Sequence, residues 1–321
     1  MKGCIVTTTI NPPTQALERF AALADWELIV VGDLETPHRE YERLDCLYLH
    51  PHDQEERYPE LCEVLPWRSI QRRNLGLVEA WNRGADVVAT VDDDNIPYDH
   101  WGSELLVGRE IEIDLYEPED EVFDPLSVTS ARQLWHRGFP IELVPSRHRV
   151  RHLGRKRRRV LVQADLWDGD PDIDAVARLA LRPRVEIEPM APFGSSRIAP
   201  FNSQNTFLSR EVLPDYAVLP HVGRMCDVWG SYLLQSRFKD CVVYNRPSVR
   251  QERTPQDTVK NLEDEILGYR HSLAFVRGGA DLQLPFVPEA TRTFYQVYRR
   301  QFAETAPATE RPGAASRPAT S

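Results

Sequence analysis

The first hundred residues alternate β-prone runs with helical segments, and this alternation constrains the fold more than any other feature. Residues 4–8, 27–31, 46–49 and 86–91 are the β-prone runs. Two segments with apolar residues at helical spacing, 15–24 and 69–83, lie between them. Strands that alternate with helices form a mostly parallel sheet with helices on its faces. We therefore expect an α/β fold with a mixed, mostly parallel sheet.

The two helical segments have recognisable ends and faces. Thr14 follows the turn-forming pair Pro12-Pro13 and is predicted to cap the helix over 15–24. In the segment 69–83 we expect Ile70, Leu77 and Trp81 to be among the buried positions.

The rest of the chain is less regular. Residues 160–168, 184–187 and 241–244 are β-prone, whereas 227–238 and 258–277 have helical spacing. We expect antiparallel additions to the first sheet and a helical C-terminal segment, within one domain over 1–303. Residues 304–321 are rich in Ala, Pro, Thr and Ser and are predicted to form a disordered tail.

Composition excludes several classes of protein. The formal net charge of -10 argues against a general nucleic-acid binder. Five cysteines without CxxC spacing favour reduced thiols over disulfides or a zinc site, which predicts a cytoplasmic protein. No run approaches the roughly 20 apolar residues of a membrane helix, and the apolar run at the N-terminus is too short for a signal peptide.

Polar residues follow the predicted strands, and the segment VVATVDDDNIP (87–97) is the most distinctive case. In an extended chain Asp92 and Asp94 share one face and Asp93 takes the other. Two carboxylates at the carboxyl end of a strand suit Mg²⁺ or Mn²⁺, which prefer oxygen ligands and often bind phosphate as well. The alternative is a solvated turn in which Asp93 or Asn95 caps the following residues.

The ordered series TTTINPPT, IVVGD, RRNLG and VVATVDDDNIP resembles the nucleotide-binding half of GT-A glycosyltransferases, with the triplet as the DxD motif. The likeness is closer to the STELLO glycosyltransferases and the plant reversibly glycosylated polypeptides, which act as UDP-arabinopyranose mutases. It continues through RGFPIEL, LWDGDPDIDA, FNSQNTFLSREVLP, GRMCDVWGSY and NLEDEILGY. The resemblance implies a GT-A (Rossmann-like) fold, with a nucleotide-binding half over 1–100 and a sugar and acceptor half over 101–303.

The resemblance also implies site residues. Asp94 and Asp92 would hold Mn²⁺ or Mg²⁺, and Asp92 would also face the ribose. Asp33 would contact the base. The nucleotide-sugar-binding set that it implies is Thr8, Thr9, Asn11, Asp33, Arg73, Asn74, Asp92, Asp93, Arg137, Asp172, Asn202, Gln204 and Asn205.

Arg73, Arg137 and Asp227 are candidates for more specific roles. A guanidinium at Arg73 or Arg137 can bind phosphate bidentately, and in the mutase relatives the arginine matching Arg73 becomes glycosylated. A solvated helix face is the alternative for Arg73. Asp227 is the candidate base for an inverting transfer, and an N-terminal helix cap is its alternative.

Two further groups of residues carry open alternatives. Asp168, Asp170, Asp172 and Asp174 are either hydroxyl contacts or a solvated loop, whereas the amides in FNSQNT have the chemistry to bind sugar hydroxyls. Where the mutase-like relatives show a metal-ligating histidine, this chain has 250–252, Arg-Gln-Glu. Glu252 is the candidate substitute ligand, and a vacant third position is the alternative.

The run RHRVRHLGRKRRR (147–159) is strongly basic in an acidic protein. We expect a solvated, mobile loop, with a loop that binds RNA or an anionic acceptor as the alternative. The run lacks interleaved aromatic residues for base stacking, which argues against nucleic acid.

These observations predict a nucleotide-sugar-dependent hexosyl- or pentosyltransferase with a UDP-sugar donor and a hydroxyl acceptor. The alternatives are a UDP-sugar mutase and a nonenzymatic binding protein that keeps the GT-A scaffold. The sequence specifies neither the acceptor nor an oligomeric state.

Overall fold

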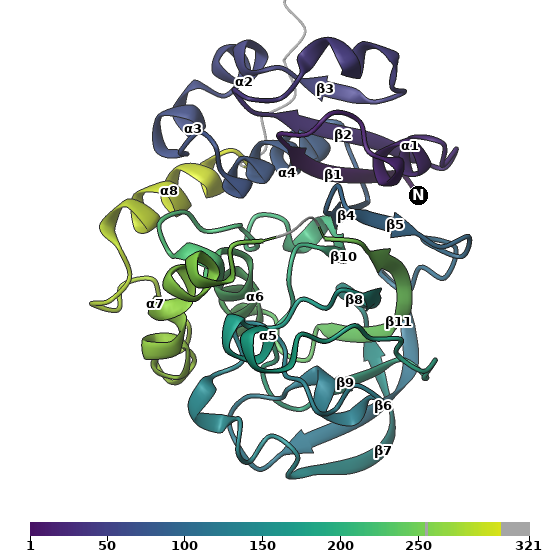
Figure 1. Ribbon diagram of the computed structural model, residues 1–321, viewed down its shortest axis with the longest axis vertical. Coiled ribbons are helices and arrows are strands. Elements are labelled where there is room, and N and C mark those ends of the chain that lie inside the picture. Colours follow the sequence, from purple (N-terminus) through teal and green to yellow (C-terminus); the bar gives the residue numbers. More distant parts are fainter. Residues whose placement is uncertain (254–255, 303–321) are drawn as a thin grey trace, which may run out of the picture.

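The computed structural model describes residues 1–253 and 256–302, so the predicted tail lies outside the described residues. Eleven strands in this part of the chain form one sheet that runs the length of the molecule (Figure 1). Along it the strands lie in the order β3-β2-β1-β4-β10-β8-β11-β9-β6-β7, and β5 pairs with β11.

The described elements have the following bounds. The strands are β1 (Gly3–Thr9), β2 (Trp26–Gly32), β3 (Leu47–Leu49), β4 (Val87–Val91), β5 (Asn95–Pro97), β6 (Glu110–Pro118), β7 (Val150–Arg159), β8 (Val162–Gly169), β9 (Phe193–Ser195), β10 (Asn205–Ser209) and β11 (Val242–Gln251). The α-helices are α1 (Gln15–Ala21), α2 (Pro51–Arg57), α3 (Pro59–Val64), α4 (Arg73–Asn82), α5 (Ala175–Leu181), α6 (Cys226–Arg237), α7 (Thr258–Arg277) and α8 (Glu289–Arg300).

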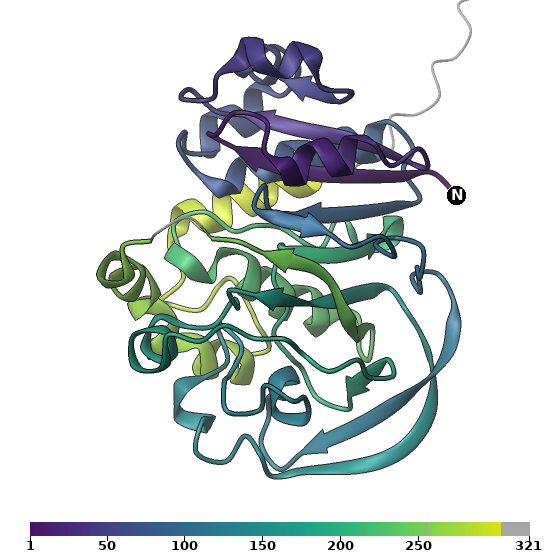
Figure 2. The same cartoon turned by 45° about the vertical axis from the view of Figure 1, so that its right-hand side comes forward.

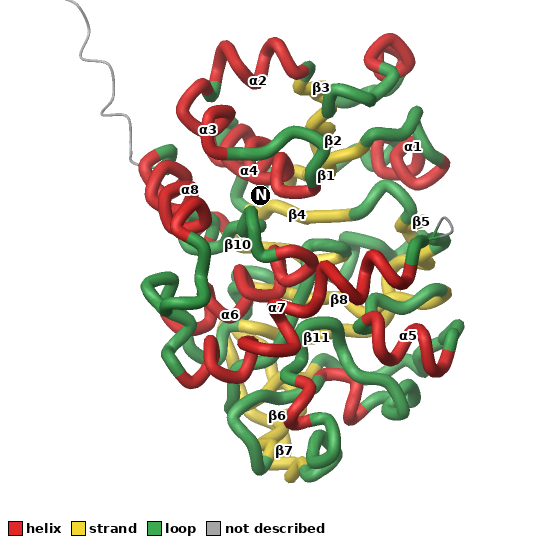
Figure 3. Tube along the Cα trace, turned by 60° about the vertical axis from the view of Figure 1, so that its left-hand side comes forward, coloured by secondary structure: helices red, strands yellow, loops and turns green. Residues whose placement is uncertain are grey.

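Strands β3, β2, β1 and β4 are parallel to one another, as the alternating pattern predicts. Their Val and Ile side chains are buried on both faces, which suits strands that lie between two layers of helix. Figure 3 shows α1 on one side of these strands and α2, α3 and α4 on the other. Because parallel strands end at a common edge, the residues after β1, β2 and β4 lie close together.

The second half of the sheet is mixed, and one reversed strand positions the site. Strand β10 runs antiparallel between β4 and β8, and its first residue, Asn205, pairs with the last residue of β4, Val91. Residues just before β10 therefore lie beside those just after β4. The predicted α/β fold with antiparallel additions is confirmed.

The helices confirm most sequence expectations and correct one. Thr14 caps α1 by accepting a hydrogen bond from the backbone N–H of Leu17, 3.3 Å away. The predicted helix over 69–83 begins with a 3₁₀ turn (Ile70–Arg72) before α4, so Ile70 is 37% exposed rather than buried. Helix α4 approaches β1 closely at Gly76, where a Cβ would come within 2.4 Å of Val6. This close packing carries Arg73, the first residue of α4, toward the end of β4.

Two expectations for the second half are wrong. Residues 150–159 of the basic run form β7, the edge strand of a long ribbon with β6, instead of a loop (Figure 2). The acidic strand β6 pairs with the backbone of β7 and provides carboxylates for its basic side chains. The basic run alone does not reveal this partner. Residues 184–187 form no strand and contribute only an isolated bridge from Val185 to Gly169.

The C-terminal helices cover the middle of the sheet. Helix α6 is almost wholly buried, α7 packs against α5, and α8 reaches back to α3. Within residues 1–253 and 256–302, every helix is too short or too polar to cross a membrane.

Candidate functional site

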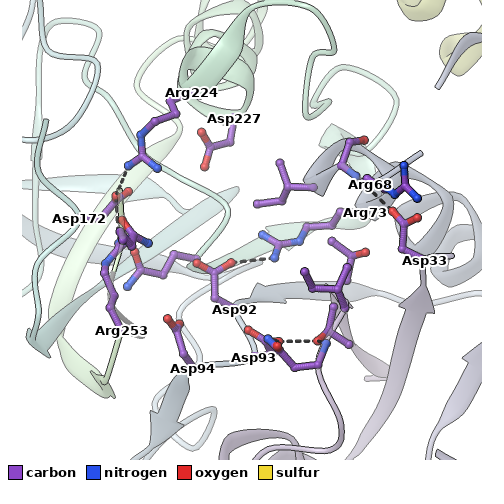
Figure 4. Close-up of a pocket in the computed structure, with 18 of the residues that line it drawn as sticks. Asp33, Arg68, Arg73, Asp92, Asp93, Asp94, Asp172, Arg224, Asp227 and Arg253 are labelled. Carbon is purple, nitrogen blue, oxygen red and sulfur yellow. Dashed lines mark hydrogen bonds and ion pairs between the residues drawn. The ribbon is translucent and has the colours of Figure 1, made fainter. Parts of the chain in front are cut away.

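A cavity of about 340 Å³, which we call the strand-end cavity, opens at the edge where β1, β2 and β4 end (Figure 4). Its charged lining residues are Asp33, Arg68, Arg73, Asp92, Asp93, Asp94, Arg137, Asp172, Arg224, Asp227 and Arg253. Six carboxylates and five guanidinium groups thus border one space, so the cavity is densely charged but close to neutral.

The aspartate triplet forms a turn. Strand β4 ends at Val91, and the N–H of Asn95 donates to the carbonyl of Asp92 at 3.2 Å. Because the chain bends here, strand alternation no longer applies, and the expectation that Asp93 points away from Asp92 and Asp94 onto an opposite face is wrong. All three aspartates line the cavity.

Asp93 ties the loop after β1 to the triplet. Its Oδ2 accepts hydrogen bonds from the Thr9 hydroxyl and, at 2.9 Å, from the Asn11 amide. Its carbonyl accepts from the Thr14 hydroxyl. Thr8, Thr9 and Asn11 line the cavity as predicted for a nucleotide pocket, although the side chains of Thr9 and Asn11 are already engaged with Asp93.

Asp33 lies at the end of β2 and is only 2% exposed. Its Oδ1 accepts from the N–H of Leu34 at 2.7 Å, and its Oδ2 accepts from the N–H of Ser69 at 3.1 Å. These bonds fix the carboxylate at the cavity wall, where each oxygen keeps a lone pair for a ligand donor.

Arg73 is buried, with 1% of its side chain exposed, so the alternative of a solvated helix face is wrong. Its Nη2 donates to Asp92 Oδ1 at 2.7 Å, and its Nη1 donates to the carbonyl and hydroxyl oxygens of Ser203 at 2.6 and 2.7 Å. The reversed direction of β10 brings Ser203 to this position. Arg73 therefore joins the aspartate triplet to the segment before β10.

Arg137 lies between two buried aspartates. Its Nε donates to both carboxylate oxygens of Asp172 at 3.1 Å, and its Nη1 and Nη2 donate to the two oxygens of Asp227 at 3.0 Å. Asn202 also donates to Asp172, at 2.7 Å. All of these groups are buried, so the fork of one guanidinium fixes two carboxylates.

Asp227 is the second residue of α6, and its carboxylate is heavily hydrogen-bonded. Besides Arg137, its Oδ2 accepts from the N–H of Ser203 at 3.0 Å, and its Oδ1 accepts from the N–H of Val228 at 3.0 Å. The N-cap of α6 is Met225, so the helix-cap alternative for Asp227 does not apply.

The electrostatics divide the cavity into two parts. Burial, followed by the charge of Asp92, raises the pKa of Asp94 to about 7, and burial raises the pKa of Asp92 despite its pairing with Arg73. Burial alone would also raise the pKa of Asp172 and Asp227, but the charge of Arg137 holds both below the usual range. The carboxyl groups whose burial is least offset by positive charge are therefore those of Asp92 and Asp94.

The donor set at the triplet fits a divalent cation in part. Asp92 and Asp94 offer hard oxygen ligands, and an oxygen of each makes no hydrogen bond within the described chain. Gln251 Nε2 lies 3.4 Å from Asp94 Oδ1, whereas the candidate ligand Glu252 is not a lining residue. No group of three or more His, Cys, Asp or Glu residues arranged for a metal occurs within residues 1–253 and 256–302. A cation here would thus need ligands from a bound substrate or water.

The remaining predicted residues serve the surrounding structure. Asn74 bonds the backbone of Gln71 and Val218, Asn202 donates to Asp172, and Asn205 accepts from Trp101. None of these three asparagines lines the cavity. Gln204 does line it. Among the four alternating aspartates only Asp172 does so, because Asp168 accepts from Tyr98 and Ile187, Asp170 pairs with Arg178, and Asp174 caps α5.

Arg224, Arg253 and Ser203 contact the predicted aspartates and arginine but are not among the residues predicted from the sequence. Arg224 Nη2 and Arg253 Nη2 lie 3.8 and 3.1 Å from Asp172 Oδ1. Arg224 stands in the segment GRMC and Arg253 directly after the positions weighed as metal ligands, so their places within quoted motifs were the available signal.

Comparison with known proteins finds a distant likeness to solved structures. No family model and no curated protein matches the chain. Two crystal structures of glucosyl-3-phosphoglycerate synthase from Mycobacterium tuberculosis, one in complex with phosphoglyceric acid, align with 86% of this chain at 15% identity. The TM-scores are 0.45 and 0.46, over 79% and 80% of those chains. A likeness at this level assigns no activity to this protein.

Proposed function

We propose that this protein is a glycosyltransferase that takes a sugar from a nucleotide donor, with a UDP-sugar as the expected donor, and transfers it to a hydroxyl group. The observation that carries the proposal is the strand-end cavity, where Asp92 and Asp94 face a space bordered by Arg73, Arg137 and Arg253. The resemblance of the motifs at these strand ends to GT-A enzymes supports it.

The reaction would proceed by exchange at the anomeric carbon. The bond from that carbon to the diphosphate oxygen breaks, the bond to the acceptor oxygen forms, and the acceptor hydroxyl loses its proton to a base. Negative charge develops on the departing nucleoside diphosphate, and groups that stabilise this charge lower the barrier. We assign this role to Arg73 and Arg137, and Mn²⁺ or Mg²⁺ held by Asp92 and Asp94 would supply Lewis-acid stabilisation.

Asp227 is kept as the candidate base, but its contacts favour a second role, in which it positions Arg137. Its carboxylate accepts hydrogen bonds from both terminal nitrogens of Arg137, and Arg137 holds its pKa low, which weakens it as a base. A positioning role predicts that Asp227→Asn raises the donor KM and lowers stability. A base role predicts that kcat falls by at least a hundredfold while donor binding stays intact.

A UDP-sugar mutase remains the alternative, and it would require Arg73 to act as the glycosylated group. Two of its three nitrogens are occupied by Asp92 and Ser203, and the side chain is 1% exposed. These contacts favour a positioning role for Arg73 and therefore favour transfer.

A two-stage experiment tests the proposal. Thermal shift with UDP, GDP, ADP, CDP and TDP, each with and without Mn²⁺, should give a metal-dependent rise in Tm with one nucleoside diphosphate. Incubation with the matching nucleotide sugars and product analysis then separates transfer and hydrolysis from ring isomerisation. The absence of a Tm shift with every nucleotide would overturn the proposal, and an isomerised sugar nucleotide would replace it with the mutase.

A further inference from the structure

We propose that a second cavity beside the strand-end cavity binds an anionic group, a phosphate or a carboxylate, on the acceptor. This inference rests on the proposed function, because it assigns the charge of the acceptor in the same reaction. The second cavity, which we call the arginine cavity, measures about 380 Å³ and is bordered by α5, the residues after it and the start of α7.

The two cavities are neighbours in the structure. Arg253 and Gln256 line both, so a group bound in the arginine cavity would lie close to the strand-end cavity. Asp172, on the strand-end side, is bonded to Arg253 at 3.1 Å. A hydroxyl group attached to an anion in the arginine cavity would therefore approach the side of the strand-end cavity that holds Asp172 and Asp227, away from the end of β2.

The arginine cavity has an excess of positive charge. Arg178, Arg182, Arg184 and Arg253 line it, against the single carboxylate of Asp170. Asp170 is shared, because it lies 2.5 Å from Arg178 Nη1 and 3.7 Å from Arg253 Nε. Within residues 1–253 and 256–302, no carboxylate lies within 4.0 Å of Arg182 or Arg184. In a chain of net charge -10, such a cluster attracts anions selectively.

Arg253 provides a second, independent observation. Its side chain is only 8% exposed, and its buried Nε has no hydrogen-bond partner. Its Nη2 donates to Asp172 and Gln251, whereas its Nη1 makes no hydrogen bond within the described residues. Burying a guanidinium group whose nitrogens are not all hydrogen-bonded costs free energy, and the charge of an anion bound beside it would reduce that cost.

The basic strand β7 is a poorer candidate for the same task. Arg151, Arg155, Arg157 and Arg159 each have a carboxylate within 4.0 Å on a neighbouring segment. Their charge is largely neutralised, although β7 carries more arginines than the arginine cavity does.

The test uses the full-length protein saturated with UDP and Mn²⁺, so that the strand-end cavity is occupied. Glycerol 3-phosphate is the probe, glycerol is its neutral match, and binding is measured by isothermal titration calorimetry. The variant R182A/R184A removes two exposed arginines from the arginine cavity, and R155A/R157A removes the same charge from β7 as a control. We expect wild type and R155A/R157A to bind glycerol 3-phosphate equally, and R182A/R184A to bind it at least tenfold more weakly.

The outcomes separate this inference from the proposed function. Absent or equal binding of glycerol 3-phosphate and glycerol, or equal weakening by both double variants, overturns the anionic site. If UDP fails to bind any of the proteins, the UDP-sugar donor falls, and the glycerol 3-phosphate titration still decides the arginine cavity on its own. Unchanged UDP affinity in R182A/R184A shows that the loss is confined to the second cavity.

Discussion

Two groups of arginines in this molecule have similar partners and opposite surroundings. Arg137 contacts two aspartates inside the protein with 8% of its side chain exposed, whereas Arg151 and Arg157 contact glutamates across the β6–β7 ribbon with more than 70% exposed. In water an ion pair contributes little, because solvent and salt screen it and side-chain entropy opposes it. In the interior the loss of one partner leaves a bare charge.

The comparison shows that arginine has two uses in this fold. Along β7 the arginines keep a long edge strand charged and hydrated, which discourages pairing with other chains. At the strand-end cavity they hold aspartates from distant segments in fixed positions. If burial makes this difference, the effect of a substitution should follow the exposure of the side chain that it removes.

The largest effect is expected at Arg137. Replacing it with alanine leaves Asp172 and Asp227 buried with less positive charge between them, so the free energy of unfolding should fall by about 3–5 kcal/mol. Chemical denaturation at pH 7 measures this loss. Arg155→Ala is the exposed control and should change stability by less than about 1 kcal/mol. Equal losses in the two variants would contradict a distinction based on burial.

Asp94 is a carboxylate of the strand-end cavity with no arginine within 4.0 Å among the described residues. Asp94→Asn should lower kcat about a hundredfold, because it removes a group proposed to hold the cation that stabilises the leaving diphosphate. Tm should not fall, since the variant also relieves repulsion from Asp92. Steady-state kinetics at saturating Mn²⁺ and donor provide the measurement, and undiminished turnover would remove Asp94 from the proposed mechanism.

Asp124 is an intermediate case between the two groups. It is buried, its Oδ1 accepts from two backbone N–H groups, and its Oδ2 lies 3.7 Å from Arg147 Nε without a hydrogen bond. Burial raises its pKa to about 7. The folded state therefore binds this proton more tightly than the unfolded state, so stability should fall as the pH rises from about 4 to 7.

Asp124→Asn should remove that part of the pH dependence, because the amide keeps the acceptor oxygen and has no charge to lose. The difference in free energy of unfolding between wild type and variant should change by roughly 1–3 kcal/mol between pH 4 and pH 7. Urea denaturation across this range isolates the effect from other titrating groups. A constant difference would show that the carboxyl stays ionised throughout.

The smallest effect is expected on β7. R155A/R157A should change the free energy of unfolding by about 1 kcal/mol or less, and 0.5 M NaCl should abolish the difference. The wild-type protein should show no salt-dependent affinity for a labelled single-stranded oligonucleotide, because the carboxylates of β6 neutralise the arginines of β7. Tight oligonucleotide binding by wild type that is lost in the double variant would restore the nucleic-acid alternative.

The sequence predicts those features of the fold that neighbouring residues specify, and it does not predict contacts between distant segments. Strands β1 to β4, the Thr14 cap and α7 are specified by neighbouring residues, and all were predicted to within a few positions. The contacts of Arg137 with Asp172 and Asp227 join segments 35 and 90 residues apart, and no local pattern encodes them. Strand β7 was misassigned because its composition resembles a solvated loop. The acidic segment 110–117 is the informative signal, because its negative charges lie opposite the positive charges of β7 across the ribbon.

The turn of the aspartate triplet is fixed on both sides by main-chain hydrogen bonds. The N–H of Asp92 donates to the carbonyl of Gln204 at 3.2 Å, β5 pairs with the end of β11, and the N–H of Glu252 donates to the carbonyl of Asp94 at 3.1 Å. The conformational entropy of this turn is therefore lost during folding and not when a ligand arrives. Affinity at the triplet should consequently depend on the pairing of β5 with β11, so a substitution there can weaken binding without altering a single ligating atom.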